Sequence, residues 1–357
     1  MPADPTPPLT PDDADTPKTP FDALTEPETV TLTGRPVAAA GADEYIREIK
    51  ETADKLVRDG AGRADVKLLA TALKELRYCL KVFAKYRGKR KVTVFGSART
   101  PPAHPAFAAA EAFGRRIAAD GWMVITGAGS GIMEAGHRGA GRENSFGLNI
   151  LLPFEQSANT VVHGDPKLMT MRYFFTRKLM FIKESDAVVL FPGGFGTHDE
   201  AFEALTLIQT GKSHLFPVVL VDEPGGTYWA TWVKFIEDDL LNRGYISPAD
   251  RSLFRVADSV EAAAREVTDF YRVYHSMRYV RKHLVLRLRR RLSDELLGRI
   301  NRDFADILAG GAFEQTAALP EEANEPLLHE MPRLTFRFDR HAVGRLRQLV
   351  DVVNQEG

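Results

Sequence analysis

Short apolar runs alternate with amphipathic segments through the middle of the chain. Between the runs, apolar residues recur at the three-to-four spacing of helices. Continuous apolar strands separated by helices are typical of a parallel sheet covered on both faces. We therefore expect an α/β fold with a Rossmann-like, doubly wound parallel sheet, whose functional loops follow the carboxyl ends of the strands. The predicted strands span 92–95, 122–126, 145–152, 186–191 and 215–221, and the predicted helices span 107–120, 167–184, 197–209 and 228–242.

Helical spacing also precedes this central region. Residues 41–88 carry isoleucines and leucines three or four positions apart, and Gly60 and Gly62 divide them into two helices. We expect an N-terminal helical extension, with Cys79 as a small core residue on its apolar face. Residues 1–40 differ, because they are rich in proline and acidic residues and lack apolar periodicity. That composition predicts a disordered, solubilising tail rather than a docking arm.

The chain changes character again at about residue 275. Basic residues become frequent, 283–288 alternates like a strand, and Ser293 is placed to cap a helix. Another strand is predicted over 334–338, followed by a last helix capped by Asp339. The expected division is therefore a tail over 1–40, N-terminal helices over 41–88, a central domain over 89–274 and a small α+β appendage over 275–357.

Composition narrows the classes of function. The net charge of −1 argues against a protein that coats nucleic acid through a globally basic surface. A single cysteine excludes a disulfide scaffold and an all-cysteine zinc cluster. No apolar run approaches the ~20 residues of a membrane span, and the acidic start lacks the features of a signal or transit peptide. We expect a cytoplasmic protein without membrane contacts.

The strongest chemical signal is PGGFGTHDE at residues 192–200, which follows a predicted strand and opens a helix. Its three glycines let the backbone bend and approach a ligand closely. The free N–H groups of a first helical turn attract anions, most often phosphate. A capping box of Thr197 with Glu200 is the alternative, but a cap does not need three glycines. We therefore favour a phosphate site formed by Gly193, Gly194, Gly196 and Thr197, and expect His198 and Asp199 to be solvated or to face a partner.

Two further turns follow predicted strands. A glycine-rich turn at 127–131 follows the second strand, and Gly96-Ser97 follows the first. The glycine spacing differs from the dinucleotide fingerprint, and no acidic residue stands where it would hold a ribose. A mononucleotide is therefore favoured over a nicotinamide or flavin cofactor. The candidate contacts to it are Gly96, Ser97, Gly127, Gly129 and Gly131.

Cations on the helix predicted over 167–184 are a third feature. Arg172 and Arg177 are five residues apart and do not share a face closely, so solvated cations on an amphipathic helix are the alternative interpretation. Glu134 and His137 form a lone ExxH pair. No second cluster of ligands accompanies them, so we expect no metal site.

The segments RYFFTRKLMF at 172–181 and PGGFGTHDE at 192–200 together resemble the LOG family. Its members are nucleoside 5′-monophosphate phosphoribohydrolases that were long labelled lysine decarboxylases. The family's PGGxGTxxE motif matches without a gap, its Arg-Lys pair falls on Arg177 and Lys178, and both glycine turns correspond. The resemblance covers about residues 90–270.

Three departures separate this chain from the short plant-like members of that family. It reads LLPFEQ at 151–156 where they read Gly-Val-Ile-Pro, it lacks their Met-His before Arg-Lys, and it has additional flanks. The chain thus resembles a longer bacterial-type member. The resemblance leaves the preferred base open among adenine, other purines, pyrimidines and cytokinins.

The resemblance implies hydrolysis of the N-glycosidic bond of a nucleoside 5′-monophosphate, as in an AMP nucleosidase. Glu200 is then the carboxylate beside the sugar cation, and Arg177 is the electrostatic partner of the leaving base. Arg172 and Lys178 are expected near the substrate, Lys178 either as support or as surface charge. No cofactor is implied, and no lysine here has the setting of a pyridoxal phosphate Schiff base. The family and the apolar faces of the 167–184 helix also imply a homodimer or larger assembly.

Two other functions are weighed against this one. A nucleotide-binding sensor of the same fold without turnover is the first, and the joint presence of Glu200 and Arg177 favours the enzyme over it. The second is a nucleic-acid role for the arginines of 287–291. Alternating arginines on a strand are more typical of a solvated or anion-binding surface.

Overall fold

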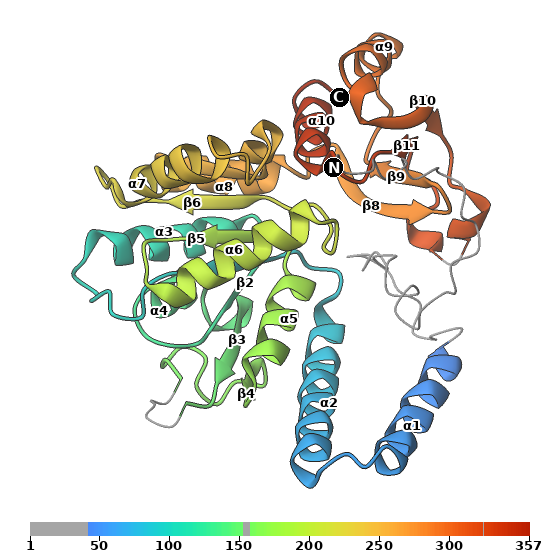
Figure 1. Ribbon diagram of the computed structural model, residues 1–357. Helices are drawn as coiled ribbons and strands as arrows, with labels where there is room; N and C mark the ends of the chain where they lie inside the picture. Colours follow the sequence, from blue (N-terminus) through green and yellow to red (C-terminus); the bar gives the residue numbers. More distant parts are fainter. Residues whose placement is uncertain (1–41, 153–157, 324) are drawn as a thin grey trace, which may run out of the picture.

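The computed structural model describes residues 42–152, 158–323 and 325–357, so the tail predicted over 1–40 lies outside the described residues. At its centre is a seven-stranded parallel sheet in the order β4-β3-β2-β1-β5-β6-β7, which confirms the predicted Rossmann-like α/β class (Figure 1). The chain starts in the middle with β1, builds outward to β4, and returns to place β5 on the other side of β1. The strands are β1 Lys91–Phe95, β2 Met123–Thr126, β3 Ser145–Ile150, β4 Leu168–Met171, β5 Ala187–Leu190, β6 Val218–Val221 and β7 Phe254–Ala257.

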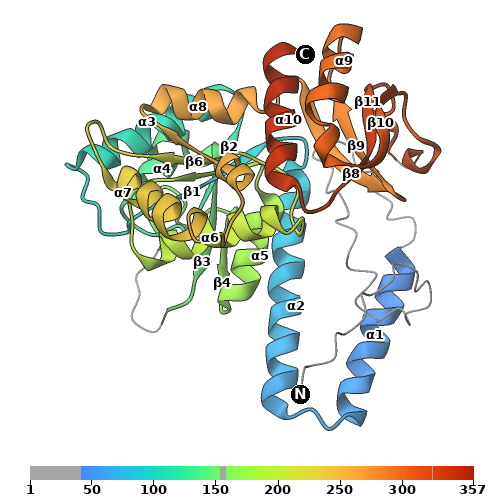
Figure 2. The same cartoon turned by 45° about the horizontal axis from the view of Figure 1, so that its top comes forward.

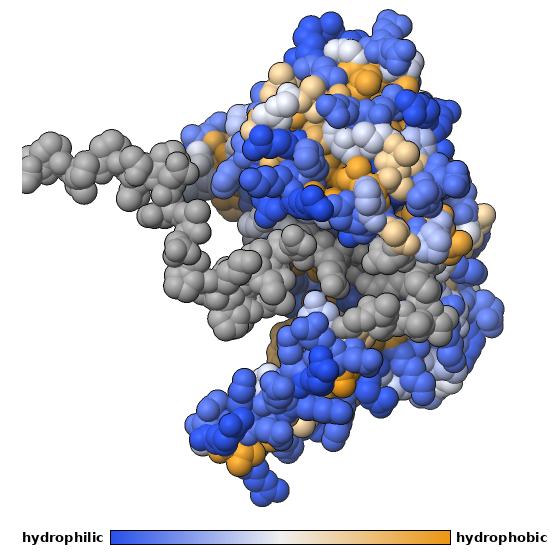
Figure 3. Space-filling view, turned by 90° about the vertical axis from the view of Figure 1, so that its right-hand side faces the viewer, coloured by the Kyte–Doolittle hydropathy of each residue, from blue (hydrophilic) through white to orange (hydrophobic). Residues whose placement is uncertain are grey.

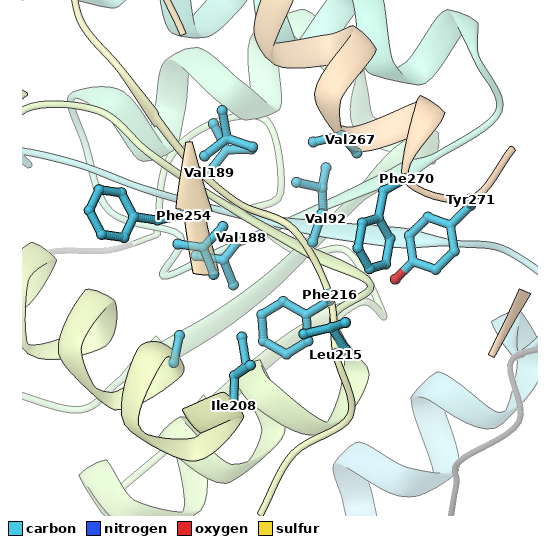
Figure 4. Packing of buried hydrophobic residues seen from close by; sticks show 14 of the residues in the cluster. Val92, Val188, Val189, Ile208, Leu215, Phe216, Phe254, Val267, Phe270 and Tyr271 are labelled. Atoms are coloured by element: carbon cyan, nitrogen blue, oxygen red, sulfur yellow. The ribbon is translucent and has the colours of Figure 1, made fainter. Parts of the chain in front are cut away.

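Helices cover both faces of this sheet. One face carries α3, which contacts both α4 and α8. The other face carries α5, α6 and α7, where Phe202 of α6 meets Trp232 of α7 with ring centroids 5.7 Å apart. Buried strand side chains such as Val92 and Val188 fill the space between the layers (Figure 4). No helix among the described residues is long and apolar enough to cross a membrane. The helices are α3 Pro105–Ala119, α4 Ile132–Ala140, α5 Phe174–Glu184, α6 Phe195–Gln209, α7 Tyr228–Phe235 and α8 Val260–Asp269.

Neither edge strand of the sheet, β4 or β7, is predicted from the sequence pattern. Leu168–Met171 forms β4, so the helix predicted over 167–184 is wrong in its first part and begins only at Phe174. The apolar residues of β4 continue the spacing of the helix behind it, and a four-residue strand is too short to show its own period. The same brevity hides β7 at the other edge. Edge strands bury less of their surface, which weakens their apolar signal further.

Beyond the central sheet, the chain forms a four-stranded antiparallel sheet in the order β10-β11-β9-β8, with α9 and α10 beside it (Figures 1 and 2). Ser293 caps α9 as predicted, accepting a hydrogen bond from the Leu296 N–H. Asp339 does not cap α10, whose N-cap is Ala342, but accepts a hydrogen bond from the His341 N–H at 3.1 Å. The elements are β8 Tyr274–Val280, β9 His283–Leu288, α9 Asp294–Asp303, β10 Leu308–Thr316, β11 Arg333–Phe338 and α10 Val343–Glu356.

The basic run of this C-terminal unit is mostly exposed, but one of its arginines is buried. Arg287 is fully buried, and its Nε donates to Glu322 Oε1 at 2.8 Å. Arg333 is also buried and donates to Glu322 Oε2 at 3.0 Å. Burial alone would raise the pKa of Glu322, but hydrogen bonds from the two arginines hold that pKa below its usual value. The expectation of a solvated or anion-binding surface is therefore wrong at Arg287, which is closed to nucleic acid.

Helices α1 (Ala42–Arg58) and α2 (Arg63–Phe83) form a hairpin that projects from the central unit (Figure 2). Cys79 of α2 is buried, as predicted, and burial raises the pKa of its thiol to about 12. Helix α1 has no buried residue. Apolar side chains therefore remain among the hydrophilic surface of the hairpin (Figure 3).

Helices α3 and α4 cross so closely that the contact requires glycine. A Cβ on Gly139 would lie 1.9 Å from Glu111 O, and one on Gly114 would lie 2.3 Å from Gly136 O. We expect Gly139→Ala to lower the free energy of unfolding by about 1–3 kcal/mol, because the helices must move apart. Gly298→Ala, at an exposed site of α9 with no atom within 4 Å, should raise it by about 0.5–1 kcal/mol. Urea unfolding measures both, and equal stabilities for the two variants would contradict this packing.

Candidate functional site

Three loops meet at the carboxyl edge of the sheet, where the strand order reverses between β1 and β5. Ser97, directly after β1, joins them. Its N–H donates to Pro192 O at 3.0 Å, and its carbonyl accepts from the Ile132 N–H at 3.0 Å. Ser130 Oγ adds a hydrogen bond to Ala98 O at 2.8 Å. A crevice at such a reversal is where open α/β sheets bind ligands.

The loops surround a cleft of about 810 Å³, and all the predicted site residues line it except Gly131, Lys178 and Arg172. Gly131 is buried, and a Cβ there would lie 2.3 Å from Ser97 O. Arg172 is exposed on the segment before α5, and its backbone N–H donates to Glu75 of α2. Gly131 is therefore needed for packing and does not line the cleft, and Arg172 lies away from the cleft.

The loop after β5 opens α6 without a side-chain cap. Gly194 is the N-cap residue, so Thr197 lies within the first turn and Glu200 on the second, and the capping box weighed as the alternative does not form. A Cβ on Gly193 would lie 2.1 Å from Thr197 Oγ1, so glycine is needed there for packing. A Cβ on Gly194 or Gly196 would meet no atom within 4 Å. The opening N–H groups of the helix thus border open space, which is the arrangement of an anion site.

A buried polar network fixes the turn after β2. The Asn159 N–H donates to Ala128 O at 2.8 Å, and its side chain bonds to the His137 ring at 3.2 Å. Burial lowers the pKa of His137 to about 4, so the ring is neutral. These contacts hold Ala128 at a φ of 62°. Glu134, the other half of the predicted ExxH pair, bonds to Arg138, and within the described ranges no three His, Cys, Asp or Glu side chains gather as metal ligands do.

Glu200 is the buried carboxylate of the cleft. It is 3% exposed, and its Oε2 lies 3.6 Å from Lys178 Nζ. Burial raises the pKa of Glu200 to about 7, although the charges of Lys178 and Arg177 oppose this rise. A carboxyl group that titrates near neutral pH in a cleft is typical of catalytic sites.

Arg177 and Lys178 follow each other on α5 but face different surroundings. Arg177 lines the cleft, and its Nη1 would lie 3.8 Å from a Cβ on Gly127. Lys178 Nζ bonds to Glu203 at 2.7 Å and to Asp199 at 3.0 Å. Burial lowers the pKa of Lys178, but these two hydrogen bonds outweigh it and raise that pKa overall. Arg177 therefore faces the ligand space, and the charged lysine stands behind the carboxylate.

Two titratable side chains of the cleft, and a tyrosine that contacts one of them, are not predicted from the sequence. Arg99 and His198 line the cleft, so the expectation that His198 is solvated or faces a partner is wrong. His198 Nε2 lies 2.6 Å from the Tyr228 hydroxyl, which donates to Gly193 O at 2.5 Å. Burial lowers the pKa of His198. Tyr228 is far from the loop in sequence, and no local pattern connects the two.

Comparisons with known proteins agree with these features. Residues 128–267 match the family model described as possible lysine decarboxylase. The chain is 31% identical over 158 residues to the cytokinin riboside 5′-monophosphate phosphoribohydrolase of Mycobacterium tuberculosis, which covers 43% of this chain and 80% of that protein. It is 33% identical over 120 residues to cytokinin riboside 5′-monophosphate phosphoribohydrolase LOG1 of Arabidopsis thaliana, covering 34% of this chain and 53% of that one.

Among solved structures, the molybdenum cofactor carrier protein of Chlamydomonas reinhardtii aligns with 50% of this chain and 97% of its own at 23% identity and a TM-score of 0.35. The match to the mycobacterial protein spans four fifths of that relative. The matched family model includes α5, α6 and the glycine loop between β5 and α6. The chain therefore belongs to the LOG family.

Proposed function

We propose that the protein hydrolyses the N-glycosidic bond of a nucleoside 5′-monophosphate and releases the free base and ribose 5-phosphate. The observation that carries this is the buried Glu200 in the same cleft as the open N-terminus of α6. An anion site and a carboxylate in one cleft suit a ribose that carries a phosphate and develops positive charge at C1′. Relatives named phosphoribohydrolases support the same reaction. We infer an AMP-like substrate.

In this mechanism, Glu200 stabilises the oxocarbenium-like transition state and accepts a proton from the attacking water. The bond from C1′ to the base nitrogen breaks with its electron pair moving to the base, and the water oxygen bonds to C1′. Arg177 stays charged and stabilises the negative charge that builds on the base. The base then takes up a proton from water.

The substrate's phosphate binds the N–H groups that open α6. Gly194 and Gly196 keep this side of the loop free of side chains. Contacts to the phosphate hold the ribose in place for reaction at C1′, so binding energy from a group that does not react contributes to the rate.

Lysine decarboxylation has no support in the cleft. Pyridoxal phosphate chemistry needs a lysine amine that is free to lose its proton and form a Schiff base. Lys178 is the lysine next to the cleft carboxylate, and Glu203 and Asp199 hold it in its charged form. That environment opposes Schiff-base formation.

The substrate assignment is tested on matched pairs of nucleotide and nucleoside. Adenine release from AMP should exceed release from adenosine by at least ~100-fold in kcat/KM, because only AMP engages the phosphate site. Chromatography of a panel of nucleoside monophosphates measures this and ranks the bases. Equal rates on adenosine and AMP would contradict the phosphate site. Tight AMP binding without release of any base would favour the nucleotide sensor.

Glu200→Gln keeps the shape of the side chain and removes its charge. Turnover should fall at least ~100-fold while the Kd for AMP changes by less than about threefold. In the wild type, kcat/KM should rise with pH through about 7, since the ionised carboxylate is the active form. Glu203→Gln is the matched control, because Glu203 also bonds to Lys178 but does not line the cleft. Near-normal turnover in Glu200→Gln would remove this residue from the mechanism.

We also propose that the protein assembles as a homodimer or larger. Phe174, Phe175 and Leu179 of α5 are about half exposed in the single chain. Helix α2 borders them through Glu75, whose carboxylate accepts from Thr176 Oγ1 at 2.7 Å. Exposed apolar side chains on neighbouring helices indicate an interface between proteins, and a two-fold dimer is the commonest solution. The hairpin adds further exposed apolar residues, among them Tyr45, Ile46, Ile49, Leu68, Leu69 and Leu73.

Light scattering at micromolar concentration should give at least twice the chain mass of 39.6 kDa. Leu179→Glu should shift the protein toward monomer, because a charge would be buried in the interface. Phe235→Glu, which also changes an exposed apolar residue but on α7, should leave the mass unchanged. A monomeric wild type with intact activity would overturn the proposed assembly.

A further inference from the structure

The loop that opens α6 is held by a side chain from another helix. The Tyr228 hydroxyl donates to Gly193 O at 2.5 Å, and His198 Nε2 lies 2.6 Å from the same hydroxyl. A tyrosine hydroxyl has one proton, so it must accept from His198, whose Nε2 therefore carries the hydrogen. The two rings are also stacked, with centroids 5.8 Å apart. A chain of two hydrogen bonds thus ends on a backbone carbonyl of the loop.

Tyr228 itself is firmly anchored. It is the first residue of α7, and the next residue, Trp229, is fully buried. The Trp229 N–H donates to Asp222 Oδ2 at 3.0 Å, and its indole Nε1 donates to Val221 O at 3.2 Å. Val221 ends β6 of the central sheet. The position of the Tyr228 hydroxyl is therefore set by the sheet and not by the loop that it contacts.

The hydrogen bond to Gly193 fixes the direction of the next N–H. The carbonyl of Gly193 and the N–H of Gly194 belong to one peptide plane, and in a trans peptide they point in opposite directions. No cis peptide occurs among the described residues. A peptide between two glycines rotates more easily than any other, because neither residue has a Cβ to restrict it. Holding the carbonyl against Tyr228 therefore prevents this peptide from turning over.

The geometry points to Tyr228 as a positioning residue that aims the Gly194 N–H into the cleft, with His198 holding the tyrosine hydroxyl in place. This inference rests on the proposed function only in taking the loop as the phosphate site. Neither residue needs to touch the substrate. Tyr228 acts through the peptide it holds, and His198 acts through Tyr228.

Isothermal titration calorimetry with ribose 5-phosphate, AMP and adenosine tests the positioning role, with AMP titrated in the Glu200→Gln background so that it is not cleaved during the measurement. Tyr228→Phe should raise the Kd for ribose 5-phosphate and for AMP by the same factor, about three- to tenfold, as expected for one hydrogen bond. The Kd for adenosine should stay within twofold, because adenosine has no phosphate. In turnover of AMP, KM should rise by a similar factor while kcat changes little. Tyr279→Phe, on β8 of the C-terminal sheet, is the matched control and should change none of these values.

His198→Phe keeps a ring against Tyr228 and removes the donor. It should weaken ribose 5-phosphate binding by less than Tyr228→Phe does, and the double variant should bind no more weakly than Tyr228→Phe alone. Such non-additivity is expected because both residues act through one hydrogen bond. Fully additive losses would contradict the chain from His198 to Gly193.

The outcomes separate this inference from the proposed function. Unchanged ribose 5-phosphate binding in Tyr228→Phe would overturn the inference, as would an equal loss of adenosine binding, which would indicate general damage to the cleft. Failure of the wild type to bind either phosphate compound would overturn it as well. If the wild type binds AMP without cleaving it and Tyr228→Phe selectively weakens that binding, the proposed hydrolysis fails and the positioning role stands.

Discussion

The backbone of one residue, Ser97, joins the loops on which the site depends. Ser97 donates its N–H to the loop after β5 and accepts at its carbonyl from the start of α4, so one residue joins the ends of three neighbouring strands. The loops can come this close together only where residues have no side chain. A Cβ on Gly96 would lie 2.6 Å from the Ile132 side chain, and one on Gly193 would lie 2.9 Å from Ser97 N. Gly96 and Gly193 are therefore needed, before any contact with a ligand, for the loops to pack against each other.

The glycines of these loops therefore have two different roles. Gly193 and Gly131 are closely packed, whereas Gly194 and Gly196 border open space. The first kind lets backbone approach backbone, and the second leaves room for a ligand to reach the N–H groups. Both kinds look alike in the sequence. This is why the motif predicts that a site exists but not which of its glycines faces the ligand.

How far sequence reasoning succeeds depends on how local each signal is. The buried central strands are continuous apolar runs in the sequence, so the sheet and the edge that bears the site can be predicted. Strand β4 cannot, because its apolar residues continue the helical spacing of α5. Within the site, the loop and Glu200 stand in one continuous motif. Thr197 does not cap α6, because the helix starts earlier, at Phe195. Tyr228 reaches the loop because the neighbouring Trp229 is anchored to the end of β6. This is a tertiary contact, which the spacing of residues in the sequence does not predict.

The N-terminal hairpin and the C-terminal unit show that the sequence alone does not tell whether a charged or apolar residue is buried or exposed. Two C-terminal arginines, Arg287 and Arg333, are buried because Glu322 accepts from both, and this pairing offsets part of the cost of removing their charge from water. This unit is also tied to the central sheet, through Arg255 and Asp351 at 2.7 Å. Helix α1 is the reverse case, since an amphipathic helix of 17 residues with none buried is marginal on its own in water. In the assembly proposed above, the exposed apolar residues of the hairpin would be covered, so assembly would stabilise this helix.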